Sequence, residues 1–159
     1  MMRLGLLLPV AVITLDQVSK ILVLHIMEPY EIVHWTTFLN WVLVFNTGVS
    51  FGLFAGEAVL LRWLLVSLAV AVSIWLSVWL YREKRPLCFC AVGLILGGAL
   101  GNALDRVLRH AVVDFIDFHL ANWHWPAFNL ADTAITIGVG LYIFASLRDH
   151  YGNSKLECK

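Results

Sequence analysis

Four long apolar stretches occupy most of this 159-residue chain, and each is long enough to cross a lipid bilayer as a helix. A membrane-spanning helix needs about 20 consecutive apolar residues. Hydrophobic residues make up 60% of the chain and charged residues only 14%, a balance that favours the bilayer over water as the surrounding solvent. We therefore predict membrane spans at about residues 4–24, 58–81, 87–108 and 130–147.

The charged residues indicate how the chain is threaded. The connection between the second and third predicted spans is short and basic, with Arg82, Lys84 and Arg85. Because basic loops stay in the cytoplasm, four spans place both termini inside and the two long connections outside. Tryptophans favour membrane interfaces, and this threading puts five near the outer one and two near the inner one. The outer group is Trp35, Trp41, Trp63, Trp123 and Trp125, and the inner group is Trp75 and Trp79.

The sequences of the first and third spans indicate more than membrane crossing. The first begins like a cleavable signal peptide, but it runs on through Asp16 and Lys20 without a small-residue cleavage site, so we expect it to remain as an anchor. The third carries Gly93, Gly97 and Gly101 on one face, where small residues allow a neighbouring helix to approach closely.

The first outer connection is rich in Val, Phe, Trp and Thr, with a turn signal at Asn46–Gly48. This composition predicts a small strand-rich element at about residues 32–54, lying on the membrane surface. The expected fold is an all-α membrane protein of four transmembrane helices, with this strand-rich element on the outer face. We expect a single domain covering residues 1–159 and a monomer.

Polar residues distant in sequence are brought to one depth by this threading, near the outer interface. They are Asp16, Lys20, Asn102, Asp105, Arg106, Asp114, Asp117, Asn129 and Asp132. A charge at membrane depth costs about 3 kcal/mol and usually faces a bundle interior or a water-filled cavity. Their convergence therefore favours a functional site.

Several of these residues also have purely structural interpretations. Asp16 and Lys20 have the spacing of an i,i+4 ion pair within one helix. Asp105 and Arg106 can cap a helix and anchor it among lipid headgroups. Asp132 suits the first turn of a helix, where the dipole favours a negative charge. These alternatives stay open at the level of single residues.

A metal site is the competing chemistry on the outer loop, where His110, His119 and His124 accompany Asp114 and Asp117. No HExxH or comparable helical ligand spacing occurs, so we expect surface histidines and neither a metal nor another cofactor.

Other functional classes have weaker support. No GxSxG motif surrounds the serines, the net charge of +0 gives no indication of nucleic acid binding, and the three cysteines do not form a disulfide framework. A small proton-coupled transporter would use Asp16, Lys20, Asp105 and Asp132 as a relay, but the polar groups do not extend across the membrane and no inverted repeat is visible. A structural subunit would leave the ordered polar residues unexplained.

Five motifs along the chain are similar to those of one family. They are Asp16–Lys20 (D-x-x-S/T-K), Asn46–Phe51 (N-x-G-x-x-F), Gly101–Arg106 (G-N-x-x-D-R), Val112–Ile116 (V-V-D-F) and Phe128–Asp132 (F-N-x-A-D). In this order, within four spans, they resemble the lipoprotein signal peptidases (signal peptidase II), bacterial enzymes that release signal peptides from prolipoproteins. Ser50 is the one departure, since alanine is frequent there in the family.

The resemblance implies an aspartic endopeptidase with Asp114 and Asp132 as its catalytic pair, and the motif selects Asp114 over the nearby Asp117. It implies substrates that are diacylglyceryl-modified prolipoproteins cleaved before the lipidated cysteine, contact with membrane lipids, no metal, and inhibition by the cyclic peptide globomycin. The enzyme would lie in the bacterial inner membrane with its site open toward the periplasm or cell exterior. The expected supporting or substrate-binding residues are Asp16, Lys20, Asn46, Gly48, Asn102, Asp105, Arg106 and Asn129.

Overall fold

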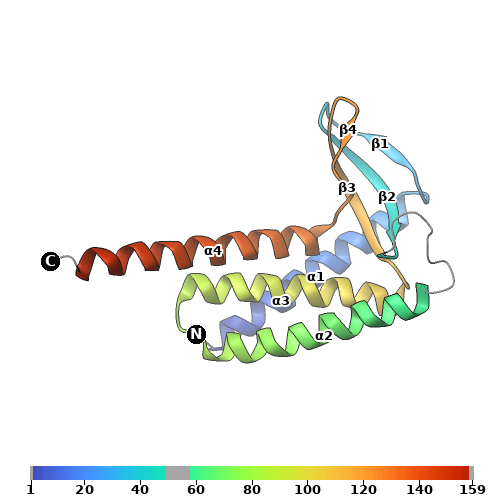
Figure 1. The fold of residues 1–159 in the computed structure, drawn as a ribbon. Coiled ribbons are helices and arrows are strands. Elements are labelled where there is room, and N and C mark those ends of the chain that lie inside the picture. The colour runs from blue at the N-terminus through green and yellow to red at the C-terminus, as the bar shows by residue number, and fades with distance from the viewer. Residues whose placement is uncertain (1, 49–57, 158–159) are drawn as a thin grey trace.

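The computed structural model of the protein describes residues 2–48 and 58–157. It contains long helices and a small antiparallel sheet (Figure 1). In chain order the elements are α1 (Met2–Ile26), β1 (Ile32–His34), β2 (Leu39–Asn46), α2 (Ala58–Arg82), α3 (Pro86–Leu108), β3 (Val112–Leu120), β4 (Trp123–His124) and α4 (Leu130–Glu157).

All four helices are long and apolar enough to cross a membrane, which confirms the four predicted spans. The helices extend beyond them, because apolar length predicts where a chain crosses the bilayer and not where its helix ends. Thus α1 covers 2–26 where 4–24 was predicted, and α4 continues to residue 157, past the predicted end at 147. Polar helix formers such as Arg148 prolong α4 without lengthening its apolar segment.

Helix α3 lies at the centre of the bundle. Its apolar window is 56% buried, whereas the windows of the other three helices are 17–22% buried. Glycines permit this close packing: a Cβ added at Gly97 would lie 2.7 Å from Val12 Cβ of α1, and one added at Gly98 would lie 2.7 Å from Ile135 Cγ1 of α4. The predicted packing role of the α3 glycines is confirmed, and Gly98 extends it to a second neighbour.

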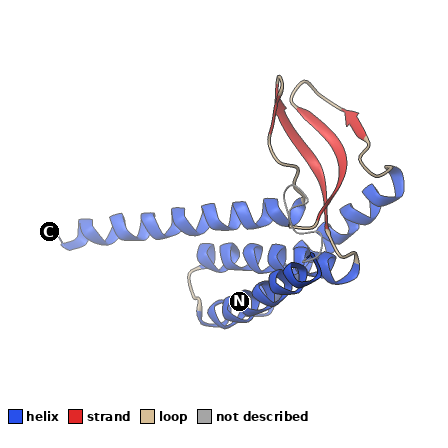
Figure 2. Ribbon diagram, turned by 45° about the vertical axis from the view of Figure 1, so that its right-hand side comes forward, coloured by secondary structure: helices blue, strands red, loops and turns tan. Residues whose placement is uncertain are grey.

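The sheet has the strand order β1-β2-β3-β4 and projects from one end of the bundle (Figures 1 and 2). It is fastened to α1 by an apolar cluster in which Val23 and Met27 meet Leu43, Val113 and Phe115. The predicted element at 32–54 supplies β1 and β2, while its residues 49–54, including Ser50 of the second motif, fall outside the described residues.

Strands β3 and β4 come from the second outer connection, for which no strand was predicted. The prediction of one strand-rich segment was therefore incomplete. The sequence V-V-D-F-I-D-F-H-L of β3 consists largely of β-branched and aromatic residues, which favour strands. Its pairing with β2 along most of its length places Asp114 on a sheet strand instead of in a loop.

Candidate active site

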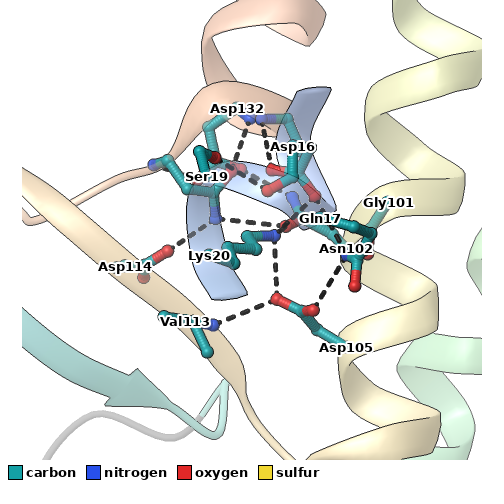
Figure 3. Close-up of polar contacts among 12 residues, drawn as sticks. Asp16, Gln17, Ser19, Lys20, Gly101, Asn102, Asp105, Val113, Asp114 and Asp132 are labelled. Atoms are coloured by element: carbon teal, nitrogen blue, oxygen red, sulfur yellow. Dashed lines mark hydrogen bonds and ion pairs between the residues drawn. The ribbon is translucent and has the colours of Figure 1, made fainter. Parts of the chain in front are cut away.

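Lys20 is fully buried and joins α1 to α3 near the end of the bundle that carries the sheet (Figure 3). Its Nζ lies 2.9 Å from Asp16 Oδ2, 2.8 Å from Asp105 Oδ2 and 3.2 Å from Asn102 Oδ1. Asp16 also accepts a hydrogen bond of 3.0 Å from the backbone N–H of Ala131, at the start of α4. The i,i+4 ion pair exists, but it is the centre of a network between helices and not a self-contained pair.

Asp105 connects this network to the sheet. Its Oδ2 accepts a hydrogen bond of 3.1 Å from the backbone N–H of Val113 on β3, and its Oδ1 accepts one of 3.0 Å from Gln17 Nε2. Arg109 forms an ion pair with the same carboxylate. Asp105 has no exposed surface, so the alternative that it anchors the helix among headgroups is wrong.

Arg106 follows Asp105 and points toward the same region. It is partly buried, and its Nη1 donates a hydrogen bond of 3.2 Å to the backbone oxygen of Asn102. Its Nε is buried without a partner in the described part of the chain. The structure thus brings Arg106 to the predicted site with one donor unused.

Asp114 is buried on β3, and both of its carboxylate oxygens accept hydrogen bonds from asparagines. Asn46 Nδ2 lies 3.0 Å from Oδ2, and Asn129 Nδ2 lies 2.7 Å from Oδ1. Burial raises the pKa of Asp114 to about 6, and the charge of Asp132 acts in the same direction, while the two asparagine bonds oppose the shift.

Asp132 lies in the first turn of α4 and closes a capping box with Asn129. The Asp132 N–H donates to Asn129 Oδ1 at 3.0 Å, and the Asn129 N–H donates to Asp132 Oδ2 at 3.2 Å. The other carboxylate oxygen accepts a hydrogen bond of 2.8 Å from Asn102 Nδ2. The helix-start interpretation of Asp132 is therefore correct for one oxygen, while the other faces α3.

The two aspartates are linked through shared asparagines. Asn129 donates its side-chain amide to Asp114 and caps the helix turn that carries Asp132. The same amide donates a hydrogen bond of 3.2 Å to Asn102 Oδ1, and Lys20 donates to that oxygen as well. With its oxygen occupied, Asn102 directs its amide nitrogen at Asp132. Asp114 and Asp132 thus share Asn129 as a hydrogen-bond partner.

Gly48 fixes the orientation of Asn46. Its φ of 82° is in the left-handed region that favours glycine, and an added Cβ would lie 2.7 Å from Leu65 Cδ1. The Gly48 N–H donates a hydrogen bond of 2.9 Å to Asn46 Oδ1, which leaves Nδ2 of that amide for Asp114.

Two apolar cavities adjoin the site on the side of α4. One has a volume of about 410 Å³ and is lined by Asp132 together with Phe118, Trp123, Trp125, Phe128, Thr133, Thr136 and Ile137. The other, of about 350 Å³, is lined by residues of the sheet and by Leu130 and Thr133. Phe118 and Phe128, whose rings stack with centroids 5.7 Å apart, line both.

The outer-loop histidines do not join the two aspartates. His124 lies against Asp117, with Nδ1 2.8 Å from Oδ2, and the rings of His119 and His124 stack. Residues 2–48 and 58–157 contain no group of three or more side chains arranged to hold a metal ion. The buried charged residues in these ranges all lie toward the sheet end of the helices or on the sheet, which argues against a proton relay across the membrane.

Three features of the site were missed from the sequence. The enrichment of β-branched and aromatic residues around Asp114 was a usable strand signal. The N-x-x-D spacing of Asn129 and Asp132 was a capping-box signal. The contact from Asp16 to the α4 backbone had no local signal, because it joins residues 115 positions apart.

The family of known proteins whose sequence model matches this chain is described as signal peptidase (SPase) II, and the match covers residues 8–148. The lipoprotein signal peptidase of Polynucleobacter necessarius subsp. necessarius (strain STIR1) is 46% identical over 91% of this chain and 90% of its own. That of Azoarcus sp. (strain BH72) is 48% identical over 90% of this chain and 82% of its own. A solved bacterial membrane enzyme superimposes with a TM-score of 0.79 at 33% identity, covering 91% of this chain and 93% of that one.

Proposed function

This chain belongs to the signal peptidase II family, and on that premise we propose that it is an aspartic endopeptidase with Asp114 and Asp132 as its catalytic pair. Its substrates are prolipoproteins that carry a diacylglyceryl group on the cysteine after the cleavage site. The enzyme hydrolyses the peptide bond before that cysteine and so releases the signal peptide.

The two aspartates have complementary roles in this hydrolysis. Asp114 is buried and keeps a proton up to a pH of about 6, so it is the general acid. Asp132 lines a cavity and meets solvent, so it is the base. Asp132 takes a proton from water, whose oxygen attacks the carbonyl carbon of the scissile bond. Asp114 then donates its proton to the nitrogen of the lipidated cysteine as the C–N bond breaks.

The observation that carries the proposal is the position of Asn129 between the two carboxylates. It donates to Asp114 at 2.7 Å and exchanges two hydrogen bonds with Asp132. Two carboxylates that share a neutral partner do not both ionise readily, which helps Asp114 to keep its proton up to a pH of about 6.

The surroundings of the pair suit a lipid-bearing substrate. The cavity beside Asp132 is lined mainly by aromatic and aliphatic side chains, and the outer surfaces of the four helices expose many large apolar residues to lipid. The acyl chains of the substrate remain in the bilayer while its peptide reaches the site from the side. Globomycin, a cyclic peptide, is expected to compete for the same position.

The enzyme is a multi-pass membrane protein, and we propose that its site opens toward the periplasm. The basic connection between α2 and α3, with Arg82, Lys84 and Arg85, lies at the end of the bundle opposite the sheet (Figure 1). The positive-inside rule assigns that end, with both termini, to the cytoplasm of a bacterial inner membrane.

A cleavage assay with a lipobox peptide containing diacylglyceryl-cysteine tests the proposed function. We expect the detergent-solubilised protein to cleave the peptide without a membrane gradient. Asp114→Asn and Asp132→Asn should each reduce cleavage at least about 100-fold, since each removes a proton-transfer group. Asp149→Asn, at the cytoplasmic end of α4, is the matched control and should cleave normally.

Normal processing by either site variant would remove that aspartate from the mechanism. Chelators should leave cleavage intact, and loss with EDTA followed by recovery with zinc would instead favour the histidines of the outer loop.

A further inference from the structure

Asp117 is a buried carboxylate that the proposed mechanism does not use. It lies on β3 between Ile116 and Phe118, which both line the apolar cavities. Successive side chains of a strand point to opposite faces, so Asp117 faces away from those cavities. Asp114, three positions earlier, is also on the opposite face from Asp117. The two aspartates therefore serve different surfaces of the sheet.

A chain of hydrogen bonds runs through Asp117 with one residue from each of the four strands. His34 Nδ1 of β1 lies 2.9 Å from Asn40 Oδ1 of β2, and Asn40 Nδ2 lies 2.9 Å from Asp117 Oδ2. On the other side, His124 Nδ1 of β4 lies 2.8 Å and 3.0 Å from the two oxygens of Asp117. Each neighbouring pair from His34 to Asp117 is also directly opposite in the strand register.

The directions of these bonds follow from the carboxylate. An ionised Asp117 only accepts hydrogen bonds, so both Asn40 Nδ2 and His124 Nδ1 donate to it. The oxygen of Asn40 is then left for His34, which donates in turn. Asn40 and Asp117 are 1% and 6% exposed, so each needs these partners to offset the loss of water. His124 is the half-exposed end of the chain and the link most easily varied.

His124, at the end of this series of hydrogen bonds, is next to residues that line the cavity beside Asp132. His124 lies between Trp123 and Trp125, both of which line that cavity. Strand β4 is only Trp123–His124, so its ladder with β3 is short. The Trp125 N–H adds one hydrogen bond of 2.7 Å to the Phe118 oxygen. The contact between His124 and Asp117 therefore adds a side-chain link to the short ladder and the backbone bond that fix the two tryptophans.

We propose that Asp117 and His124 are positioning residues that hold Trp123 and Trp125 against the substrate and so set its affinity. This inference rests on the proposed function. It assigns the two residues no part in proton transfer, because their contact is on the face of the sheet opposite Asp114. Losing the contact should loosen substrate binding and leave the catalytic step nearly unchanged.

Two substitutions at His124 separate the hydrogen bond from the ring. His124→Phe keeps a ring against His119 and removes the donor, whereas His124→Asn keeps an amide donor in a similar position. With the diacylglyceryl lipobox peptide, His124→Phe should raise KM about three- to tenfold and change kcat by less than about twofold. His124→Asn should restore most of the affinity. His25→Phe, at an exposed histidine of α1, is the matched control and should change neither constant.

A binding measurement without turnover completes the test. In an Asp114→Asn background, His124→Phe should raise the Kd of the same fluorescently labelled peptide by the factor seen in KM. Unchanged KM and Kd, a fall in kcat alone, or no rescue by His124→Asn would each overturn the inference. Cleavage by Asp114→Asn itself would refute the proposed catalytic pair, and the Kd comparison would still decide the role of His124.

Discussion

Asn46, Asn102 and Asn129 each use the amide oxygen on one set of donors and direct the amide nitrogen at a carboxylate. The Asn46 oxygen accepts from the Gly48 N–H, and its nitrogen donates to Asp114. The Asn102 oxygen accepts from Lys20 and Asn129, and its nitrogen donates to Asp132. The Asn129 oxygen accepts from the Asp132 N–H, and its nitrogen donates to Asp114. Because every oxygen is occupied, no amide can turn over without losing a hydrogen bond. The donors around the two aspartates are therefore fixed before a substrate arrives.

At the scale of single residues, the pH dependence of cleavage tests the proposed role of Asp114. Burial raises the pKa of Asp114 to about 6, so its acid form persists to that pH and is lost as the pH rises further. We expect kcat/KM, which reports the free enzyme, to fall above a pH of about 6, approaching tenfold per pH unit. A rate that stays flat or rises between about pH 6 and pH 8 would contradict the assignment of Asp114 as the acid.

Asn46→Ala provides the control for this profile. The Asn46 hydrogen bond lowers the pKa of Asp114, so its removal should move the descending limb to higher pH. A shift toward lower pH would show that another group controls the limb.

At the scale of elements, the four spans were predictable because about 20 apolar residues in a row have few alternatives to a membrane helix. The motifs also placed Asp114, Asp132 and their asparagines in one site. Pairing across the sheet was not predictable, because it depends on β2 and β3, which are separated by two whole helices. The chain through Asp117 was hidden for the same reason, since it needs the register of all four strands.

The close packing of α3 against α4 leads to a prediction about Gly98. A Cβ added at Gly98 would lie 2.7 Å from Ile135 Cγ1 and would also meet the Ala131 backbone oxygen, so the start of α4 has to move away. Gly98→Ala should destabilise the protein by about 1–3 kcal/mol. It should also reduce cleavage, because Asp132 directly follows Ala131.

The comparison for Gly98→Ala is Gly140→Ala, since an added Cβ there meets nothing within 4 Å. Thermal unfolding in detergent and the cleavage assay are the measurements. Equal behaviour of the two variants would mean that α4 can shift without cost to the site.

At the scale of the whole molecule, the bundle has a sheet and a polar network at one end and a basic connection at the other (Figure 1). The end with the basic connection also carries a local cluster in which Arg85 contacts both Glu83 and Asp149. The Arg85 side chain holds the pKa of Glu83 at about 2, so that carboxylate stays charged at physiological pH. The charged residues at this end suit the aqueous face of the membrane.

Labelling of introduced cysteines tests the orientation, in a chain whose native cysteines are replaced by alanine. A membrane-impermeant maleimide should label Asn122→Cys, next to β4, in intact cells. Lys84→Cys, between α2 and α3, should react only after permeabilisation. The reverse pattern would place the proposed site in the cytoplasm and separate it from exported prolipoproteins.

The hydrogen bond from the Ala131 backbone to Asp16 has a consequence for how the enzyme comes into being. The first of the four spans supplies a cap for the fourth, so Asp132 is positioned only when α4 has joined the bundle. A chain with three inserted spans holds Asp114 but lacks its proposed partner. We therefore expect proteolytic competence only once all four spans are in place, which protects neighbouring precursors from a half-built enzyme.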